Sequence, residues 1–279
     1  MTGPSSTHVL ITTDLDRTLI FSQRATCELG GALPADPVEV ADGRTAGELC
    51  HAARDSIAAL PVNVRMCVAT SRSVARLMRL RLPFAVPYAI AANGGVVLVD
   101  GAADPQWAAR TRRLVSRAAP AAQVRAVLAG SSAVAGSVAP WLVRMGDSDD
   151  MCCLAIVDPA LMGAERVSDV VSRCHDLGWE ASLVGRKLYA FPAGLGKEHA
   201  AAFVAGKVAR ETGVVPRRFA AGDTEHDRLM LADADVAWVP AGCELAAARR
   251  ARQFKVTEQP GHAAAAQIAR EWVRECSPL

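Results

Sequence analysis

The sequence predicts an α/β fold in which a mostly parallel, Rossmann-like sheet is covered by helices and is interrupted by an inserted α+β domain. Short apolar runs of strand length alternate with longer stretches of helical spacing, a pattern typical of βαβ units. The strands expected in the parallel sheet cover residues 8–15, 64–70, 88–92, 219–222, 236–239 and 254–257. Helical spacing between them is seen at Ala201, Val204 and Val208.

This alternation breaks between about residues 95 and 192. Further strands are expected at 96–99, 141–145, 152–157, 181–184 and 187–191, and helices at 106–129 and 160–178. The last two strands meet at Gly185-Arg186, where we expect a hairpin. We therefore predict a discontinuous core domain, 1–95 with 191–279, and an inserted cap domain at 96–190.

The composition is that of a globular protein and leaves the partner class open. The 279 residues carry a formal net charge of +2, which is too small to attract nucleic acid or an anionic membrane. The eight cysteines form no CxxC pattern and no zinc-spaced quartet. Two uncharged stretches, 82–99 and 126–143, are interrupted by Pro and Gly or are mostly small residues, so neither predicts a transmembrane helix. The N-terminus is unlike a secretory signal, so we expect a cytoplasmic protein.

Asp14, Asp16 and Thr18 follow the first predicted strand. Two carboxylates two residues apart project to the same side, at the strand end where open α/β sheets bind ligands. Taken alone, this short pattern is equally consistent with a turn in which Asp and Thr side chains bond to backbone N–H groups. A functional interpretation therefore needs further residues at the same edge of the sheet.

Three other features supply such residues. Residues 70–72, Thr-Ser-Arg, follow the second strand and combine a hydroxyl with a helix N-terminus, which suits an anion. Lys197 begins a helix after a Gly-Leu-Gly turn. Asp223 follows a later strand, and Asp227 comes four residues after it. Because carboxylates, hydroxyl and lysine arrive at successive strand-end loops, they jointly predict an active site.

In this combination the sequence resembles the haloacid dehalogenase (HAD) superfamily. Its four motifs are matched by Asp14/Asp16/Thr18, Thr70, Lys197 and Gly222-Asp223 with Asp227. An insert between the second and third motifs, and Asn93-Gly94-Gly95 after the third strand, are similar to the Cof-type and sugar-phosphatase branch with its large α/β cap. The segments DLDRTLIFS, LPFAVPYAIAANGG and VDGAADPQW resemble HAD-like hydrolases of tellurium-resistance-type gene neighbourhoods.

The resemblance implies a phosphoryl-transfer mechanism. Asp14 would attack the phosphorus and form an aspartyl-phosphate, which water then hydrolyses. Asp16 would protonate the leaving oxygen and then activate the water, and we expect repulsion from Asp14 to raise the pKa of Asp16 for this role. Carboxylates and a phosphate in one pocket need a cation, so Mg²⁺ held by Asp14, the Asp16 carbonyl and Asp223 is the expected cofactor.

The remaining motif residues would bind the phosphoryl group. The resemblance implies that Thr70, the Ser71 N–H and Lys197 hold its oxygens, while Asp227 orients Lys197 or a metal-bound water. Candidate substrate contacts are Asn93 and Gly94.

Two cations on predicted cap strands, Arg144 and Lys187, are also candidate substrate contacts, for a second anionic group of the substrate. A solvated strand face is the simpler interpretation of both residues. The segment 21–50 is longer than in minimal family members, and its prolines and Asp42-Gly43 suggest an extra loop or hairpin near the entrance. Its role stays open.

Three residues depart from the family pattern. Arg17 and Ser71 stand where members commonly have Gly, and His226 stands where Cof-type members usually have Asn. None of these changes removes a reacting group, and the role of His226 stays open.

The sequence therefore predicts a Mg²⁺-dependent phosphomonoesterase acting on a small phosphorylated metabolite, with a sugar phosphate favoured. One alternative is a phosphomutase, which would return the phosphoryl group to its substrate. Another is a regulatory protein that binds phosphate without turnover, although intact Asp14 and Asp16 argue against it. Neither nucleic acid nor a membrane is an expected partner, and the oligomeric state is open.

Overall fold

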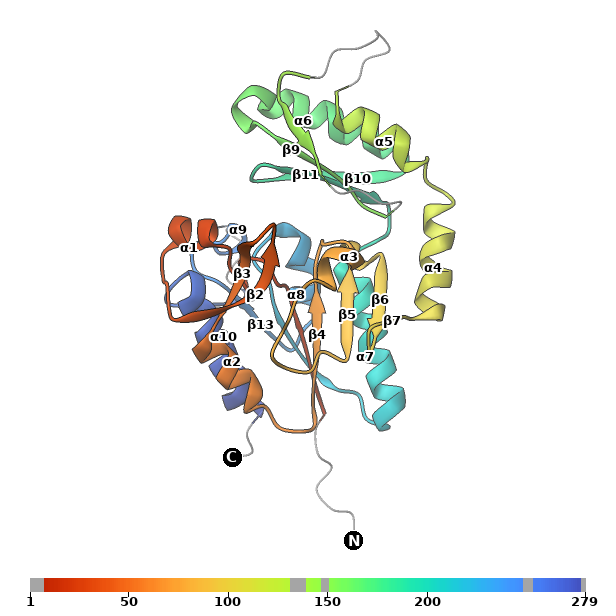
Figure 1. Ribbon diagram of the computed structural model, residues 1–279. Coiled ribbons are helices and arrows are strands. Elements are labelled where there is room, and N and C mark those ends of the chain that lie inside the picture. The colour runs from red at the N-terminus through yellow and green to blue at the C-terminus, as the bar shows by residue number, and fades with distance from the viewer. Residues whose placement is uncertain (1–7, 131–138, 147–150, 248–252, 277–279) are drawn as a thin grey trace.

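An eight-stranded sheet forms the centre of the computed structural model, which describes residues 8–130, 139–146, 151–247 and 253–276. The strand order is β14-β13-β12-β1-β4-β5-β6-β7 (Figure 1). The six parallel strands are β1 (Val9–Thr13), β4 (Val64–Ala69), β5 (Tyr88–Ala91), β12 (Arg217–Ala221), β13 (Val236–Val239) and β14 (Lys255–Val256). They lie where the apolar runs predict strands.

Helices cover both faces of this sheet because successive strand residues point to opposite sides. On one face, Leu10 of β1 packs with α7 (Lys197–Thr212) and with Met230 of α8 (Arg228–Ala232). On the other, Ile11 packs with α2 (His51–Ala58) and α10 (Gly261–Cys276), beside α1 (Gln23–Leu29). Two short helices, α3 (Val74–Leu77) and α9 (Glu244–Ala247), follow strands β4 and β13. No described helix is both long enough and apolar enough to cross a membrane.

A second sheet lies above the carboxyl ends of the central strands (Figure 1). Its four antiparallel strands have the order β10-β11-β9-β8. Their bounds are β8 (Leu142–Met145), β9 (Cys153–Val157), β10 (Trp179–Val184) and β11 (Lys187–Pro192). Helices α5 (Ala121–Leu128) and α6 (Pro159–Asp176) bury one face of this sheet. The other face is turned toward the central sheet, and the expected hairpin joins β10 to β11.

The predicted α/β class with an α+β insert is thus confirmed, but one predicted helix is wrong. Residues 106–129 form two helices, α4 (Pro105–Val115) and α5, rather than one. Pro120 is the N-cap of α5, and a proline disfavours helical geometry at the residue before it.

One strand that the sequence places in the insert continues the central sheet, together with a short strand that the sequence did not predict. These are β6 (Val96–Val99), which pairs antiparallel with β5, and β7 (Ala102–Ala103). The division of the chain at 95–96 and 190–191 stays a prediction.

A separate hairpin follows the first motif. Its strands are β2 (Ala35–Ala41) and β3 (Arg44–Cys50), and they turn at Asp42-Gly43, where both residues have positive φ angles of 50° and 71°. Asp and Gly tolerate this left-handed region, so the turn is of the kind that the dipeptide favours. Backbone bonds in both directions between Phe21 and Glu48 fix the hairpin to the loop after β1. Two short 3₁₀ helices, η1 (Ala92–Gly94) and η2 (Glu225–Asp227), complete the loops at this end of the sheet.

Candidate active site

The first and last motifs meet because β1 and β12 are neighbours in parallel register. Thr13 pairs with Ala221, so the chain leaves both strands at the same level. The Asp14 N–H donates to the Ala221 carbonyl at 2.8 Å, which places Asp14 beside the loop that carries Asp223. Parallel strands bring their carboxyl ends to one edge, and this is the edge that the sequence predicts.

Three carboxylates and one ammonium group form the centre of the site. Oxygens of Asp14, Asp223 and Asp227 lie within 4.8 Å of one another, and all three residues are buried. The Lys197 Nζ donates to Asp14 Oδ1 and to Asp227 Oδ1, both at 2.6 Å. Only 2% of the Lys197 side chain is exposed, so this ammonium group is held by its two carboxylate partners.

Burial controls the protonation of this cluster. Desolvation raises the pKa of Asp14 to about 7, although the Lys197 charge lowers it. Desolvation and the charge of Asp14 raise the pKa of Asp223 well above its ordinary value. One lysine does not neutralise three carboxylates, and oxygen donors are the ligands that Mg²⁺ prefers. The donor set therefore fits a hard divalent cation.

Asp227 is fixed by the backbone of its own loop. Its Oδ2 accepts from the Asp223 N–H at 3.1 Å and from the Thr224 N–H and hydroxyl, both at 3.0 Å. A Cβ at Gly222 would lie 2.4 Å from the Asp227 Cβ, so a residue without a side chain is needed there. One oxygen of Asp227 is thus anchored while the other receives Lys197.

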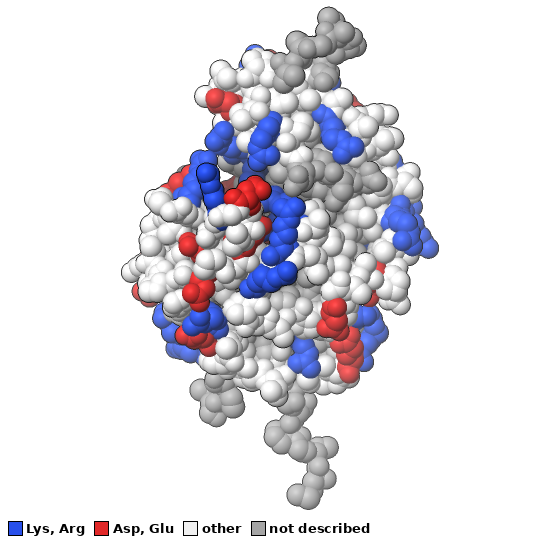
Figure 2. Space-filling model, viewed as in Figure 1, with Lys and Arg blue, Asp and Glu red and all other residues white. Residues whose placement is uncertain are grey.

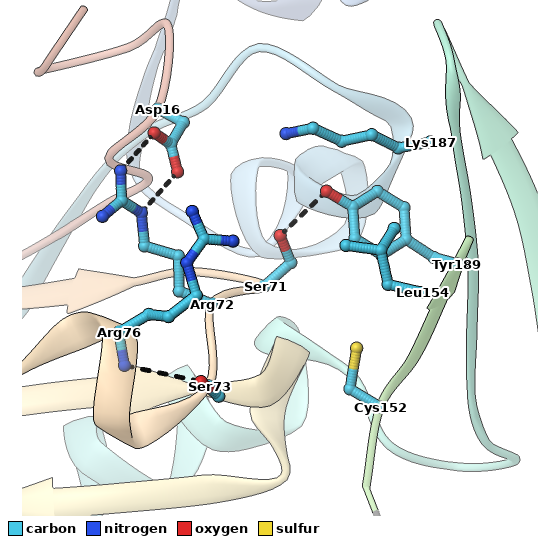
Figure 3. A pocket seen from close by; sticks show the side chains of 9 residues that line it. All are labelled: Asp16, Ser71, Arg72, Ser73, Arg76, Cys152, Leu154, Lys187 and Tyr189. Atoms are coloured by element: carbon cyan, nitrogen blue, oxygen red, sulfur yellow. Dashed lines mark hydrogen bonds and ion pairs between the residues drawn. The ribbon is translucent and has the colours of Figure 1, made fainter. Parts of the chain in front are cut away.

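Asp16 has a different environment from the one expected. Arg72 Nε and Nη2 donate to Asp16 Oδ2 and Oδ1 at 2.8 and 2.7 Å (Figure 3). Arg72 Nη1 donates to Glu39 Oε2 at 2.7 Å. Desolvation raises the pKa of Asp16, but the bonds to Arg72 outweigh it and hold that pKa below its ordinary value. The prediction of a raised pKa for Asp16 is therefore wrong, because the arginine outweighs the desolvation of this carboxyl.

The second motif turns at the end of β4. Thr70 is buried, and its hydroxyl accepts the Arg72 N–H at 3.1 Å. The Ser71 hydroxyl lies 3.5 Å from the Tyr189 hydroxyl of β11, so this loop meets the second sheet (Figure 3).

Asn93 and Gly94 contact the backbone of the loops that carry Thr70 and Lys197. The Asn93 N–H donates to the Thr70 carbonyl at 3.0 Å. A Cβ at Gly94 would lie 2.3 Å from the Gly196 carbonyl oxygen, next to Lys197. Neither residue lines the cleft of about 880 Å³ that contains Asp14 or the smaller cavity of about 60 Å³ beside Asp16.

A cleft of about 880 Å³ lies between the sheet edge and the insert. Its lining includes the predicted residues Asp14, Asp16, Ser71, Lys197 and Asp223 from the core and Arg144 and Lys187 from the insert. Figure 2 shows acidic side chains in a hollow of this face, with Lys and Arg side chains around them. A smaller cavity of about 60 Å³ adjoins Asp16 and is lined by Arg76, Lys187 and Tyr189 among others (Figure 3).

The two cap cations lie in one row across the second sheet. Arg144 of β8 pairs with Ile156 of β9, and Ile156 pairs with Lys187 of β11. Adjacent pairs in a row project from the same face of a sheet. Both cations therefore project toward the cleft.

His226 joins the core loop to the insert. Its Nε2 lies 2.6 Å from the Ser182 hydroxyl of β10, and its ring packs edge-on against Tyr189 and Phe191 at 5.3 and 5.6 Å. Burial, followed by the nearby Lys197 charge, lowers the pKa of His226 to about 4. The imidazole is therefore neutral at pH 7, and it serves as a contact between the two sheets.

Three residues of the site were not predicted from the sequence: Glu39, Arg72 and Tyr189. Arg72 directly follows the second motif, which was a usable signal, because a guanidinium suits a carboxylate in the same loop cluster. Tyr189 shares its face of β11 with Lys187 two residues earlier, as the strand period predicts. Nothing in the sequence around Glu39 distinguishes it from a solvated strand residue.

The fold of this chain is similar to that of solved phosphatase structures. No family model and no curated protein matches the sequence. Among solved structures, sucrose-phosphatase from Synechocystis sp., in complex with sucrose and phosphate, is 13% identical with a TM-score of 0.61 and covers 95% of this chain and 98% of its own. The C-terminal domain of trehalose-6-phosphate phosphatase from C. albicans is also 13% identical, with a TM-score of 0.61 over 98% of this chain and 94% of its own. A phosphatase of the haloalkanoate (HAD) superfamily from Bacteroides thetaiotaomicron is 14% identical, with a TM-score of 0.52 over 98% and 97%.

Proposed function

The fold is that of HAD-superfamily phosphatases, and from this premise we propose that the chain is a Mg²⁺-dependent phosphatase. It hydrolyses a small phosphorylated metabolite through an aspartyl-phosphate. The observation that carries this proposal is the buried cluster in which Lys197 contacts Asp14 and Asp227, with Asp223 alongside, at the edge of a cleft. Fold likeness alone would not suffice, because one fold hosts many functions.

Asp14 is the proposed nucleophile. Its carboxylate lines the cleft, and Lys197 holds one of its oxygens, which leaves the other free to approach a phosphorus atom. The phosphoryl group moves to Asp14 and the leaving oxygen departs on the side of Asp16.

Asp16 exchanges the proton in both steps. It gives a proton to the leaving oxygen and takes one from the attacking water. The bonds to Arg72 favour its ionised form, which suits the second step. The negative charge of a bound phosphoryl group beside Asp16 favours the protonated form that the first step needs.

The cation site is proposed for Mg²⁺, held by Asp14, Asp223 and the Asp16 carbonyl, with Asp227 nearby. When bound, the ion neutralises charge on the transferring phosphoryl group. Thr70, the Ser71 N–H and Lys197 are proposed to hold the phosphoryl oxygens, and Asp227 orients Lys197 through their 2.6 Å contact.

A sugar phosphate is the favoured substrate class. The likeness to proteins described as sucrose-phosphatase and trehalose-6-phosphate phosphatase supports it. So does the cleft, which at about 880 Å³ suits a small molecule rather than a folded macromolecule. We propose that residues 96–190 act as a specificity domain whose Arg144 and Lys187 contact the far end of the substrate. A cytoplasmic location without nucleic-acid or membrane partners fits this function.

A panel of phosphorylated metabolites, tested with Mg²⁺ and read as released inorganic phosphate, tests the proposal. We expect release from at least one sugar phosphate and none by the Asp14→Asn variant. Isomerised substrate without free phosphate would indicate a phosphomutase instead. Binding of phosphate compounds without any turnover would contradict the proposal and support a regulatory protein.

A further inference from the structure

Glu39 lies in a hairpin outside the motifs, yet it is part of a buried chain of ion pairs that ends at Asp16. Arg72 connects them, with 2.7 Å to Glu39 and 2.7 and 2.8 Å to Asp16. We propose that Glu39 is a positioning residue that, through Arg72, fixes the carboxylate of Asp16 for proton transfer. This inference rests on the proposed function of Asp16.

The geometry of the guanidinium supports a positioning role. Arg72 uses one edge of its planar fork for both oxygens of Asp16 and its remaining Nη1 for Glu39. Two parallel bonds fix the plane of the Asp16 carboxylate relative to the arginine. The bond to Glu39 holds the far side of the guanidinium, so the arginine has a fixed support behind it.

The three ion-paired residues differ in burial: Glu39 and Arg72 are buried, and Asp16 is partly exposed. The side chains of Glu39 and Arg72 are only 4% and 5% exposed, whereas that of Asp16 is 44% exposed and faces the cleft. A reacting group at the solvent-accessible end is thereby anchored to an ion pair within the protein. Buried ion pairs are weak contributors to stability, because desolvation offsets their attraction. Stability alone is therefore a poor explanation for this arrangement.

The backbone of β2 aims Glu39 inward. The register with β3 is irregular on both sides of Glu39, between Pro37 and Glu39 and between Glu39 and Val40. A bulge of this kind changes the alternation of a strand and redirects a side chain. Consequently Val38 and Glu39 are both buried, although successive strand residues normally face opposite sides.

The hairpin that carries Glu39 is held at two places. The Arg81 N–H donates to the Val38 carbonyl at 2.8 Å, and Phe21 and Glu48 exchange backbone bonds of 2.9 and 2.8 Å. The bond from Arg81 connects the hairpin to the segment after Arg72, and the bonds with Phe21 connect it to the loop that carries Asp16. Glu39 is thus built on a support shared with both of its partners, as a precise site requires. The proposal thus gives a role to the segment 21–50, which would position Asp16 through Glu39 and Arg72.

The test compares Glu39→Leu, which removes the acceptor, with Glu39→Gln, which keeps an acceptor but loses the charge. Glu48→Gln on the partner strand of the same hairpin is the matched control, because Arg72 pairs with Glu39 and Asp16 and not with Glu48. The value of kcat/KM is measured with phenyl phosphate and with p-nitrophenyl phosphate, whose leaving group needs less help from an acid. Thermal melting checks the fold of each variant.

We expect Glu39→Leu to lower kcat/KM for phenyl phosphate about 10-fold, with a smaller loss for p-nitrophenyl phosphate and an intermediate effect of Glu39→Gln. In an Asp16→Asn background the same change should alter kcat/KM less than about 2-fold, because Glu39 acts only through Asp16. A purely structural role would lower both substrates equally and would persist in that background.

Wild-type kinetics in a folded Glu39→Leu protein, or equal losses with and without Asp16, would overturn the inference while leaving the phosphatase proposal intact. If Glu39→Leu does not fold, the Glu39→Gln variant provides the test. A wild-type kcat/KM for phenyl phosphate in Glu39→Gln would then overturn the inference. A wild-type protein that hydrolyses neither substrate nor any member of the metabolite panel overturns both.

Discussion

Asp14→Asn should make the metal-free protein more stable at pH 8 than the wild type. Desolvation raises the pKa of Asp14 from 3.8 to about 7 in the folded state. Between these values the folded protein keeps a proton that the unfolded chain releases, so the wild type loses stability as pH rises from about 4 to about 7. Asparagine resembles the protonated carboxyl and does not titrate, so the variant avoids this loss.

The size of the effect follows from the shift. A difference of about 3 pH units at about 1.4 kcal/mol each gives about 4 kcal/mol at pH 8, where the loss is complete. For a chain of this length that is on the order of 10 °C in Tm. The advantage of the variant should shrink toward zero as the pH falls toward 4.

Chemical unfolding in excess chelator at pH 5 and pH 8 measures this difference. Asp16→Asn is the control of opposite sign, since Arg72 lowers the pKa of Asp16 and the ionised carboxylate stabilises the fold. That variant should be less stable than the wild type at pH 8, and its deficit should fade below the ordinary pKa of an aspartate. An Asp14→Asn protein no more stable than the wild type at pH 8 would refute the argument that Asp14 is desolvated.

Three further predictions concern the reaction. Asp16→Asn should lower turnover of a sugar phosphate about 10²- to 10⁴-fold and affect the first step with p-nitrophenyl phosphate less, and equal losses on both would count against an acid at this position. Asp223→Ala should weaken Mg²⁺ affinity in a calorimetric titration. For the wild type, Ca²⁺ should support binding but little turnover, and full activity in excess chelator would exclude a metal role. Replacing Arg144 or Lys187 by Ala should raise KM for the preferred sugar phosphate and spare kcat for a small aryl phosphate, and unchanged KM would assign these cations to a solvated face.

The sequence was informative where local pattern and tertiary structure agree. The apolar runs at 64–69 and 236–239 form buried strands, and Asp14 and Asp223 follow strands that become neighbours. Strand ends were less predictable. β12 begins at Arg217, two residues before the predicted strand, and the prediction omitted Arg217 and Arg218 because their charges are untypical of a buried strand. The Arg217 charge is accommodated there by an ion pair with Glu275 of α10 at 3.0 Å.

Contacts between distant segments could not be predicted from the sequence. Glu39 and Arg72 are 33 positions apart, and a bulge turns Glu39 against the strand period. The pKa of Asp16 is lowered by its bonds to Arg72, 56 positions away, so a prediction made from its neighbour Asp14 alone had the wrong sign. His226 likewise has its partners, such as Ser182, on the insert, and nothing near His226 in the chain indicates them.

An aspartyl-phosphate on Asp14 can be trapped by rapid acid quench after the Asp16→Asn variant is mixed with a ³²P-labelled phosphomonoester that has a good leaving group. With such a substrate we expect this variant to form the intermediate faster than it hydrolyses it. We expect labelled protein whose label maps to the peptide that contains Asp14, and no label on the double variant that carries both Asp14→Asn and Asp16→Asn. Release of labelled phosphate without any labelled protein, or a label on a residue other than Asp14, would contradict the aspartyl-phosphate mechanism.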